Sequence, residues 1–390
     1  MEKAYLKAIF VLLMVATSFA FGCQPGNSSG KTRNNSDAQV MVVSLSTDGR
    51  YALSSHLNNT LVLWDLQKKT KATISSQSNI YSAYFIKGTD KFLWQNSNGT
   101  VHVQDIAGNT IKTFPHFPTY GHVMSPDLQT YFSSDQNWNV FFGYGEMKAV
   151  KRDGDSPSFF VGKLLNFSLS KDGRILLSAG DGSSLADSEP IEKYPPINPE
   201  QRFSNYAGVV LWDAKTQNPI AKLAGNAAKT HATMSPDGKH IVSGCENGLG
   251  FVWNVSAPHN EPMVVGHPGL GVLTEKGWDN TGGIDLPLDF DGGHHSGILG
   301  QFFIDTVHYV RIYTYEPYAF LYHVDNPLPL KYLPLGRDPF PAVSDYSRNV
   351  AIDTAPDAGV LVMGQRAGSG IIVYQYHPEK QELEKVWAGN

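Results

Sequence analysis

The chain has 390 residues, of which 41% are hydrophobic, 12% aromatic and 17% charged, with a formal net charge of −5. The hydrophobic fraction is sufficient for a globular core and excludes a wholly disordered protein. The slightly acidic balance gives no reason to expect nucleic-acid binding, which needs basic patches. With 37 Gly and 23 Pro, the aromatic content is typical of an all-β protein with many turns.

The N-terminus predicts an export signal. Lys3 and Lys7 precede an uncharged apolar run of about 15 residues, from 8 to 22. A membrane-spanning helix needs about 20 such residues, so the run is typical of a secretory signal rather than a permanent anchor. We therefore expect residues 1–22 to be a signal peptide.

The end of this run, "FAFGC", resembles a bacterial lipobox, in which small or apolar residues precede a cysteine that is lipidated and becomes the mature N-terminus. Ala20 stands where leucine is usual, and Phe21 where a small residue is usual. The resemblance implies that Cys23 carries a lipid. The alternative is ordinary signal cleavage after Ala20, which would give a soluble exported protein.

Residues 23–38 are expected to form the lipidated cysteine and a flexible tether. "QPGNSSGKTRNNSDA" has almost no apolar side chain to pack into a core. Gln24 rather than Asp follows the cysteine, which by resemblance to enterobacterial sorting rules implies a lipid anchor in the outer membrane, facing the periplasm. The chain has two cysteines, Cys23 and Cys245. We therefore expect no disulfide framework, and a free, buried thiol at Cys245.

From residue 39 onward the sequence repeats one order of turns and apolar runs. "SLSTDGRYALSSHLNNTLVLWDL" and "ATMSPDGKHIVSGCENGLGFVWNV" are the clearest copies. In each, Asp-Gly supplies one tight hairpin turn, and Asn-Asn or Asn-Gly marks the next. A third strand carries Trp, and a short fourth strand completes the unit. Because four short strands cannot bury both faces alone, we expect the units to stack radially around a channel.

These repeats resemble the WD-repeat β-propeller family, and the resemblance covers nearly everything after residue 38. At the family period of about 40 to 45 residues, residues 39–390 without two long insertions give seven units. The sequence therefore predicts an all-β fold, a seven-bladed β-propeller of four-stranded antiparallel blades, with insertions at 181–207 and 266–297. The signal peptide and the flexible tether precede it.

In WD-repeat proteins a His, Ser, Asp and Trp within one blade form a structural hydrogen-bond network. The resemblance implies such scaffold roles for Ser54 and Trp64, without a matching His, and for His231, Ser243 and Trp253. A buried strand serine lacks an oxyanion hole and access, so a nearby His is no evidence for hydrolysis. The sequence indicates no catalytic residue.

The long connections carry the main functional signal. Because consecutive strands are antiparallel, second-to-third turns and the connections between blades lie on one face. The stretches 181–207, 266–297 and 334–348 all leave from it, and we call it the inserted-loop face. Loops of this length are usually functional or disordered. We expect this face to bind partners through Tyr194, Phe203, Tyr206, Trp278 and Phe290, or else these rings only pin the loops to the disc.

The stretch "DFDGGHH" places two aspartates and two histidines close together. Adjacent histidines rarely converge on one ion, and neither the helical spacing of zinc enzymes nor a calcium loop is present. The sequence also contains no phosphate-binding loop, nucleophile elbow or dinucleotide fingerprint. We predict no metal and no cofactor, and nothing in the sequence compels an enzyme.

These observations favour one function and leave a second open. The favoured function is a membrane-tethered lipoprotein that acts as a protein–protein interaction scaffold in a bacterial envelope complex, such as outer-membrane assembly or a secretion apparatus. Its partners would be envelope proteins on the inserted-loop face and the membrane through the N-terminal lipid. The alternative is a periplasmic propeller enzyme or small-ligand-binding protein, with its site at the central channel or under the inserted loops.

Overall fold

The first hairpin turn of three of the described sheets follows from a short motif, Ser-x-Asp-Gly. In a computed structural model of the protein, Ser46 Oγ donates to Asp48 Oδ1 at 2.6 Å, and the same carboxylate accepts the Arg50 N–H at 3.1 Å. Gly49 has a φ of 67°, the left-handed conformation that glycine adopts without strain. The serine-to-aspartate bond recurs in the pairs Ser125–Asp127, Ser170–Asp172 and Ser235–Asp237.

The structure describes a discontinuous part of the chain. The described residues are 39–76, 80–96, 98–114, 120–134, 140–144, 163–181, 209–216, 219–223, 230–245, 250–258, 260–269, 271–274, 277–279, 284–286, 298–313, 318–335, 351–365 and 370–389. The predicted signal peptide, lipidated Cys23 and tether lie outside them. Within these ranges, no helix is both long and apolar enough to cross a membrane.

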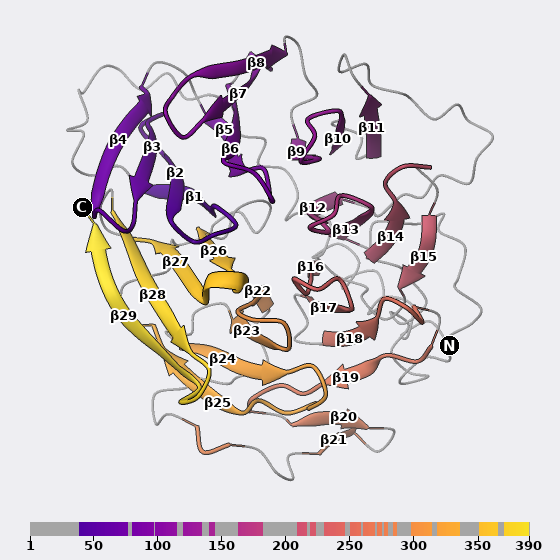
Figure 1. Ribbon diagram of the computed structural model, residues 1–390. Helices are drawn as coiled ribbons and strands as arrows, with labels where there is room; N and C mark the ends of the chain where they lie inside the picture. The colour runs from indigo at the N-terminus through magenta and orange to yellow at the C-terminus, as the bar shows by residue number, and fades with distance from the viewer. Residues whose placement is uncertain are drawn as a thin grey trace, which may run out of the picture. The chain divides into compact units, whose positions relative to one another are not determined.

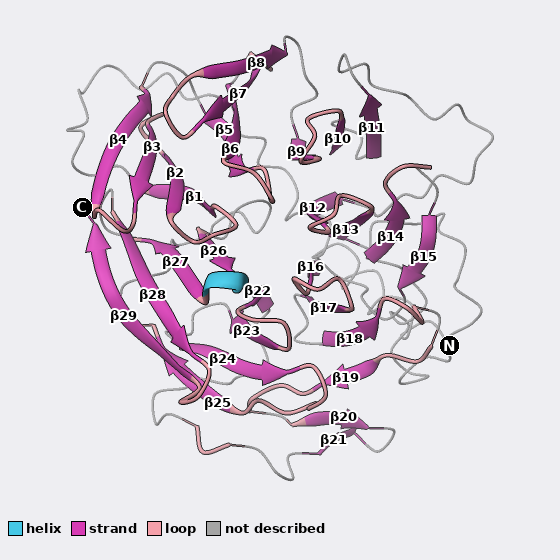
Figure 2. Ribbon diagram, in the orientation of Figure 1, coloured by secondary structure: helices cyan, strands magenta, loops and turns pink. Residues whose placement is uncertain are grey.

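Six four-stranded antiparallel blades form most of the described chain, each made of four strands consecutive in sequence (Figures 1 and 2). The first two are β1 (Val40–Leu45), β2 (Tyr51–His56), β3 (Leu61–Asp65) and β4 (Thr70–Ser75), and then β5 (Ile80–Phe85), β6 (Lys91–Asn96), β7 (Val101–Asp105) and β8 (Thr110–Phe114). The next two are β12 (Lys163–Leu169), β13 (Ile175–Asp181), β14 (Val209–Asp213) and β15 (Pro219–Leu223), and then β16 (Thr230–Met234), β17 (His240–Cys245), β18 (Gly250–Asn254) and β19 (Met263–Val265).

The last two blades complete the chain. They are β22 (Ile298–Phe303), β23 (His308–Tyr313), β24 (Tyr318–His323) and β25 (Lys331–Pro334), and then β26 (Ile352–Ala355), β27 (Val360–Gly364), β28 (Ile371–His377) and β29 (Glu382–Gly389). A short 3-10 helix, η3 (Pro356–Ala358), forms the turn between β26 and β27 and is cyan in Figure 2.

The all-β propeller with four-stranded antiparallel blades is confirmed, but the expected number of seven blades is wrong. Six four-stranded blades are described, and a sheet of three described strands, β9 (Tyr120–Met124), β10 (Thr130–Ser134) and β11 (Val140–Tyr144), lies between β8 and β12 in the chain. Residues 145–162, which follow β11, read "GEMKAVKRDGDSPSFFVG" and lie outside the described ranges. Dividing the chain length by a repeat period counts every stretch of about 40 to 45 residues as a whole blade, whereas the described strands form six four-stranded sheets.

The hydrophobic core lies between neighbouring sheets. Leu177 and Leu211 of the β12–β15 blade, for example, share a buried cluster with Phe251 of the β16–β19 blade. Another buried cluster contains Trp64 of the first blade and Val362 of the last. The first and last blades therefore pack against each other. Each such buried side chain contributes about 1.5–3 kcal/mol. Stacking between sheets therefore supplies the burial that one thin blade cannot achieve.

Candidate functional site

The connections that carry the insertions all start and end at the same end of the blades. They run between β13 and β14, between β19 and β22, and between β25 and β26. Strands pair antiparallel in sequence order in each of these blades. Second-to-third turns and connections between blades therefore share one end, as the strand order predicts. The first-to-second turns, such as Ser46–Arg50, lie at the opposite end, which we call the turn face.

The base of the second insertion is bonded to the β22–β25 blade. Tyr322 donates its hydroxyl to the Gly266 carbonyl at 3.0 Å, and the Gly266 N–H donates to the Pro327 carbonyl at 2.6 Å. The next residue, His267, is buried and packs its ring edge-on against Tyr313 at 5.0 Å. This end of the insertion is therefore fixed by hydrogen bonds and by packing.

Beyond this base the insertion forms a hairpin of its own. Strand β20 (Val272–Thr274) pairs with β21 (Gly277–Asp279), and Leu273 lies opposite Trp278. Further along, Ile284 and Leu286 pack against the buried cluster between the β16–β19 and β22–β25 blades. Sequence reasoning missed the hairpin because strands of three residues are too short to show a periodic pattern.

Of the insertion residues and the cysteines that the sequence analysis named, two lie in the described ranges. Trp278 lies on β21, and Cys245 ends β17, the second strand of its blade as predicted. Outside the described ranges lie the lipidation site Cys23, the partner-binding candidates Tyr194, Phe203, Tyr206 and Phe290, and Asp289, Asp291, His294 and His295 of "DFDGGHH". Among the residues that are described, no three or more His, Cys, Asp or Glu side chains are placed to hold a metal ion.

In the first blade a Trp, a Ser and a His are joined by hydrogen bonds. Trp64 Nε1 donates to Ser54 Oγ at 2.7 Å, and Ser54 Oγ lies 2.8 Å from His56 Nε2. Ser54 and Trp64 were named from the sequence without a matching His; in the structure His56, two residues after Ser54 on the same strand, contacts the serine. The equivalent indole N–H of Trp253 in the β16–β19 blade has no hydrogen-bond partner among the described residues.

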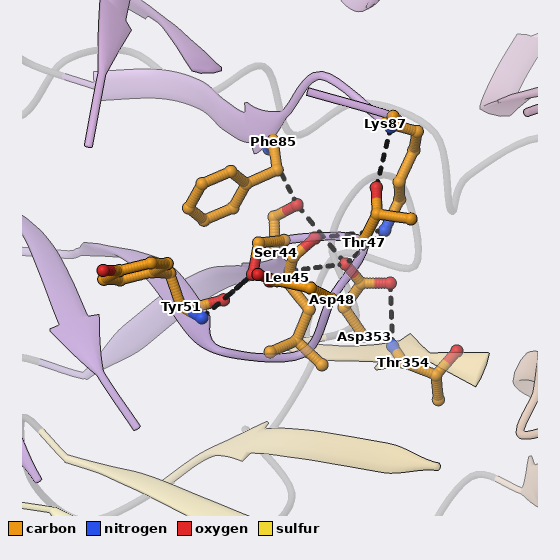
Figure 3. A network of polar contacts seen from close by, with 11 residues as sticks. Ser44, Leu45, Thr47, Asp48, Tyr51, Phe85, Lys87, Asp353 and Thr354 are labelled. Atoms are coloured by element: carbon orange, nitrogen blue, oxygen red, sulfur yellow. Dashed lines mark hydrogen bonds and ion pairs between the residues drawn. The ribbon is translucent and has the colours of Figure 1, made fainter. Parts of the chain in front are cut away.

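A second polar network joins three blades at their first strands (Figure 3). Asp353 on β26 accepts the Leu45 N–H at 2.7 Å, the Ser44 hydroxyl at 3.3 Å and Lys87 Nζ at 3.3 Å. Ser44 Oγ in turn accepts the Phe85 N–H from β5 at 3.0 Å. A first strand pairs on one side only, so half of its backbone groups need partners elsewhere. Side chains of the preceding blade supply a partner for two of them, the Leu45 and Phe85 N–H groups.

His231 makes a related contact between two blades. Its Nδ1 accepts the Gln301 N–H at 3.4 Å, and its carbonyl accepts Gln301 Nε2 at 2.7 Å. Burial lowers the pKa of His231 to about 4, against the negative charge of Asp353, which raises it. The ring is therefore neutral at pH 7, in agreement with an Nδ1 that accepts a hydrogen bond.

The most unusual group in the described chain is a buried cation. Arg311 on β23 is fully buried, and its Nη2 donates to the Ser243 carbonyl at 3.2 Å and to Gln301 Oε1 at 3.3 Å. The guanidinium carbon lies 5.1 Å from the centre of the Tyr322 ring and 5.9 Å from that of Tyr309. Among the described residues, its Nε and Nη1 and the Tyr309 hydroxyl have no hydrogen-bond partner of normal geometry; the charge of Arg311 also interacts with Tyr313.

Comparison with known proteins agrees with the repeat architecture. A family model described as "WD domain, G-beta repeat" matches residues 27–65 and 217–254, which contain β1 to β3 and β15 to β18. A search of curated proteins found no match. Together with the four-stranded antiparallel blades, the two matches support a WD-repeat β-propeller, a fold that suggests a protein-interaction scaffold.

Proposed function

We propose that this protein is a membrane-tethered lipoprotein whose propeller acts as a protein–protein interaction scaffold in a bacterial envelope complex, such as outer-membrane assembly or a secretion apparatus. Its partners bind the inserted-loop face, and lipid on Cys23 holds it in the outer membrane, facing the periplasm. The repeat matches and the "FAFGC" junction support the two halves of this proposal.

The observation that carries the binding face is the bonded base of the second insertion. Tyr322 and Pro327 hold Gly266, and the hairpin β20–β21 follows within a few residues. A loop that is already ordered loses less conformational entropy when a partner binds. A standard interface uses roughly 800 Å² of each partner, and three long connections leave from this one face.

The experiment that tests the binding face is capture of partners from detergent-solubilised envelopes, with the full chain at native level. Replacing residues 184–204 by Asn-Gly shortens the connection between Asp181 and Val209 to eight residues, with a tight Asn-Gly turn within it. We expect the shortened protein to fold and to lose its partner, while Arg174→Ala, in an exposed turn on the turn face, captures it normally. If the shortened protein folds and captures every partner, the binding face is elsewhere.

The tether is tested separately with Cys23→Ser. A lipidated cysteine that bears several acyl chains gives stable membrane anchoring. We expect the variant to leave the membrane fraction and to lose incorporation of labelled palmitate. A wild-type protein that is membrane-bound but unlabelled would contradict lipidation at Cys23.

A further inference from the structure

The turn between β3 and β4 is rich in exposed positive charge. The segment 65–71 reads "DLQKKTK", with three lysines and one carboxylate. Lys68, Lys69 and Lys71 are all exposed. Lys68 Nζ lies 3.4 Å from Asp65 Oδ2, and Lys71 Nζ lies over the Trp64 ring, 5.2 Å from its centre. One carboxylate does not balance three cations, so this end of the first blade carries a net positive charge.

Lys69 occupies a position that glycine usually takes. Its φ is 57°, the left-handed conformation that few residues with a side chain adopt. In the same turn of the second blade, between β7 and β8, the left-handed residue is Gly108, with a φ of 85°. The Lys68 N–H donates to Asp65 Oδ1 at 2.9 Å, which fixes the first-blade turn. The lysines are therefore presented from an ordered backbone that a glycine would form with less strain.

The outer strand of the last blade adds apolar side chains beside these lysines. Trp387 of β29 packs edge-on against Trp64 at 5.9 Å, and Lys71 lies over the same Trp64 ring. Strands β4 and β29 are neighbours in Figure 1. Val386 is 44% exposed, and Lys385 beside it is exposed as well. We call the exposed side chains of residues 68, 69, 71, 385 and 386 the lysine patch.

The chemistry of the lysine patch fits an anionic lipid surface better than an acidic protein. Lysine is a compact point charge that suits a diffuse layer of phosphates, whereas protein carboxylates are best bound by the planar fork of arginine. Tryptophan and exposed aliphatic side chains enter the boundary between headgroups and acyl chains. The carboxylates of β29, Glu382 and Glu384, lie nearer the start of the strand, and Glu384 contacts His377 at 3.0 Å.

We propose that the lysine patch docks the propeller on a bilayer surface that contains anionic phospholipids. This inference rests on the proposed function, in which lipid on Cys23 holds the chain beside a membrane. The β3–β4 turn lies at the same end of its blade as the turn face, because consecutive strands are antiparallel. Docking there directs the inserted-loop face away from the bilayer, toward envelope proteins.

The length of the chain allows this orientation. Strand β1 begins at Val40, at the inserted-loop end of the first blade, and its six residues span about 20 Å. Residues 24–38 can reach about 50 Å when extended. A lipid on Cys23 can therefore lie in the same bilayer that the lysine patch contacts.

The test is co-sedimentation of the exported Cys23→Ser protein with lipid vesicles. This variant cannot carry the lipid, so its vesicle binding does not depend on whether Cys23 is lipidated in the wild type. We expect binding to vesicles of phosphatidylethanolamine and phosphatidylglycerol that weakens as salt is added, and no binding to phosphatidylcholine vesicles. Equal binding to both kinds of vesicle, or binding to neither, would overturn the proposal.

Charge variants in this background locate the surface. Lys69→Gln with Lys71→Gln should weaken binding to the anionic vesicles about 25-fold, at about fivefold per lysine. The matched control is Lys171→Gln with Lys239→Gln, which removes the same charge from exposed turns of two other blades. The control should bind within about twofold of its parent. Undiminished binding by the Lys69/Lys71 variant, or an equal loss in the control, would contradict docking through the lysine patch.

An apolar pair of variants tests the contribution of β29. Val386→Ser should weaken vesicle binding about fivefold, because less apolar surface enters the bilayer. Ile220→Ser, on β15 with a similar exposed fraction of 40%, should leave binding unchanged. If the parent protein binds neither kind of vesicle while the Lys69/Lys71 variant loses an envelope protein in the capture experiment, the patch serves an acidic protein and the lipid proposal is wrong.

Discussion

The β1–β4 and β22–β25 blades share one topology but bury polar groups in opposite ways. In the β1–β4 blade, Ser54 accepts the indole N–H of Trp64 and lies within hydrogen-bond distance of His56. In the β22–β25 blade, Arg311 occupies the second strand, and two of its three nitrogens have no hydrogen-bond partner of normal geometry among the described residues. The first arrangement is satisfied within one blade. The second depends on the neighbouring β16–β19 blade, which contributes Gly250 and the Ser243 carbonyl.

This difference shows that the blade topology does not require the Trp-Ser network. The β22–β25 blade has the same four antiparallel strands and packs on both neighbours through buried apolar clusters. Apolar packing between sheets therefore forms the blade, and the polar network adds specificity to it. Substitutions in the two blades should then differ in how much unfolding free energy they remove. They should also differ in whether they disturb one blade alone or a neighbouring blade as well.

The largest effect is expected for Gly250→Ala. The new Cβ would overlap the guanidinium of Arg311 and would lie 2.7 Å from the Ser243 carbonyl oxygen. We expect a loss of about 3 kcal/mol or more of unfolding free energy, measured by urea denaturation. In an Arg311→Ala background, the same change should cost less, although the carbonyl contact remains. Equal costs in the two backgrounds would show that Arg311 does not impose glycine at 250.

Asp353→Ala should have the next largest effect, because it removes the acceptor for the Leu45 N–H, Ser44 and Lys87 together. We expect a loss of about 2–3 kcal/mol in the same measurement. Asp357→Ala is the matched control, since Asp357 makes an exposed ion pair with Lys171 at 2.7 Å. The control should change stability by less than about 0.5 kcal/mol. Similar losses for both would mean that the polar network around Asp353 contributes no more than a surface ion pair.

Ser54→Ala tests the satisfied network of the first blade. It removes the acceptor of the Trp64 indole N–H and the partner of His56 Nε2. We expect a loss of about 2 kcal/mol, and about 1 kcal/mol for Ser178→Ala, whose hydroxyl accepts the Trp212 indole N–H. A larger loss at Ser178 than at Ser54 would contradict the role given to His56.

The smallest effect is a pH dependence at the His231–Gln301 contact. Because the pKa of His231 is lowered to about 4 in the folded state, the unfolded chain binds more protons between about pH 6.5 and pH 4. The contribution of His231 is fully present above about pH 6.5 and is lost as the pH falls through this window. We expect roughly 1–2 kcal/mol of difference between the wild type and His231→Gln across it. Parallel pH profiles of the two proteins would contradict this assignment.

The sequence predicts a structural feature well when residues close together in the chain determine it, and poorly when distant residues do. The Asp-Gly turns, the antiparallel order of strands and the shared end of the three long connections were predictable, because adjacent residues determine them. The blade count was not, because the repeat period does not show which units are complete. Arg311 and Asp353 were missed because their partners lie in other blades, 68 residues away at Ser243 and 308 residues away at Leu45. A charged residue inside the apolar run "HYVRIYTY" was the available signal for Arg311.

The proposed scaffold function is tested most directly by site-specific photo-crosslinking in intact cell envelopes. A photoreactive residue replaces Trp278 on the β20–β21 hairpin, and a second protein carries it at Arg174 on the turn face. We expect position 278 to crosslink to a defined envelope protein and position 174 to give no such product. A defined crosslink from position 174 with none from position 278 would contradict binding through the inserted-loop face.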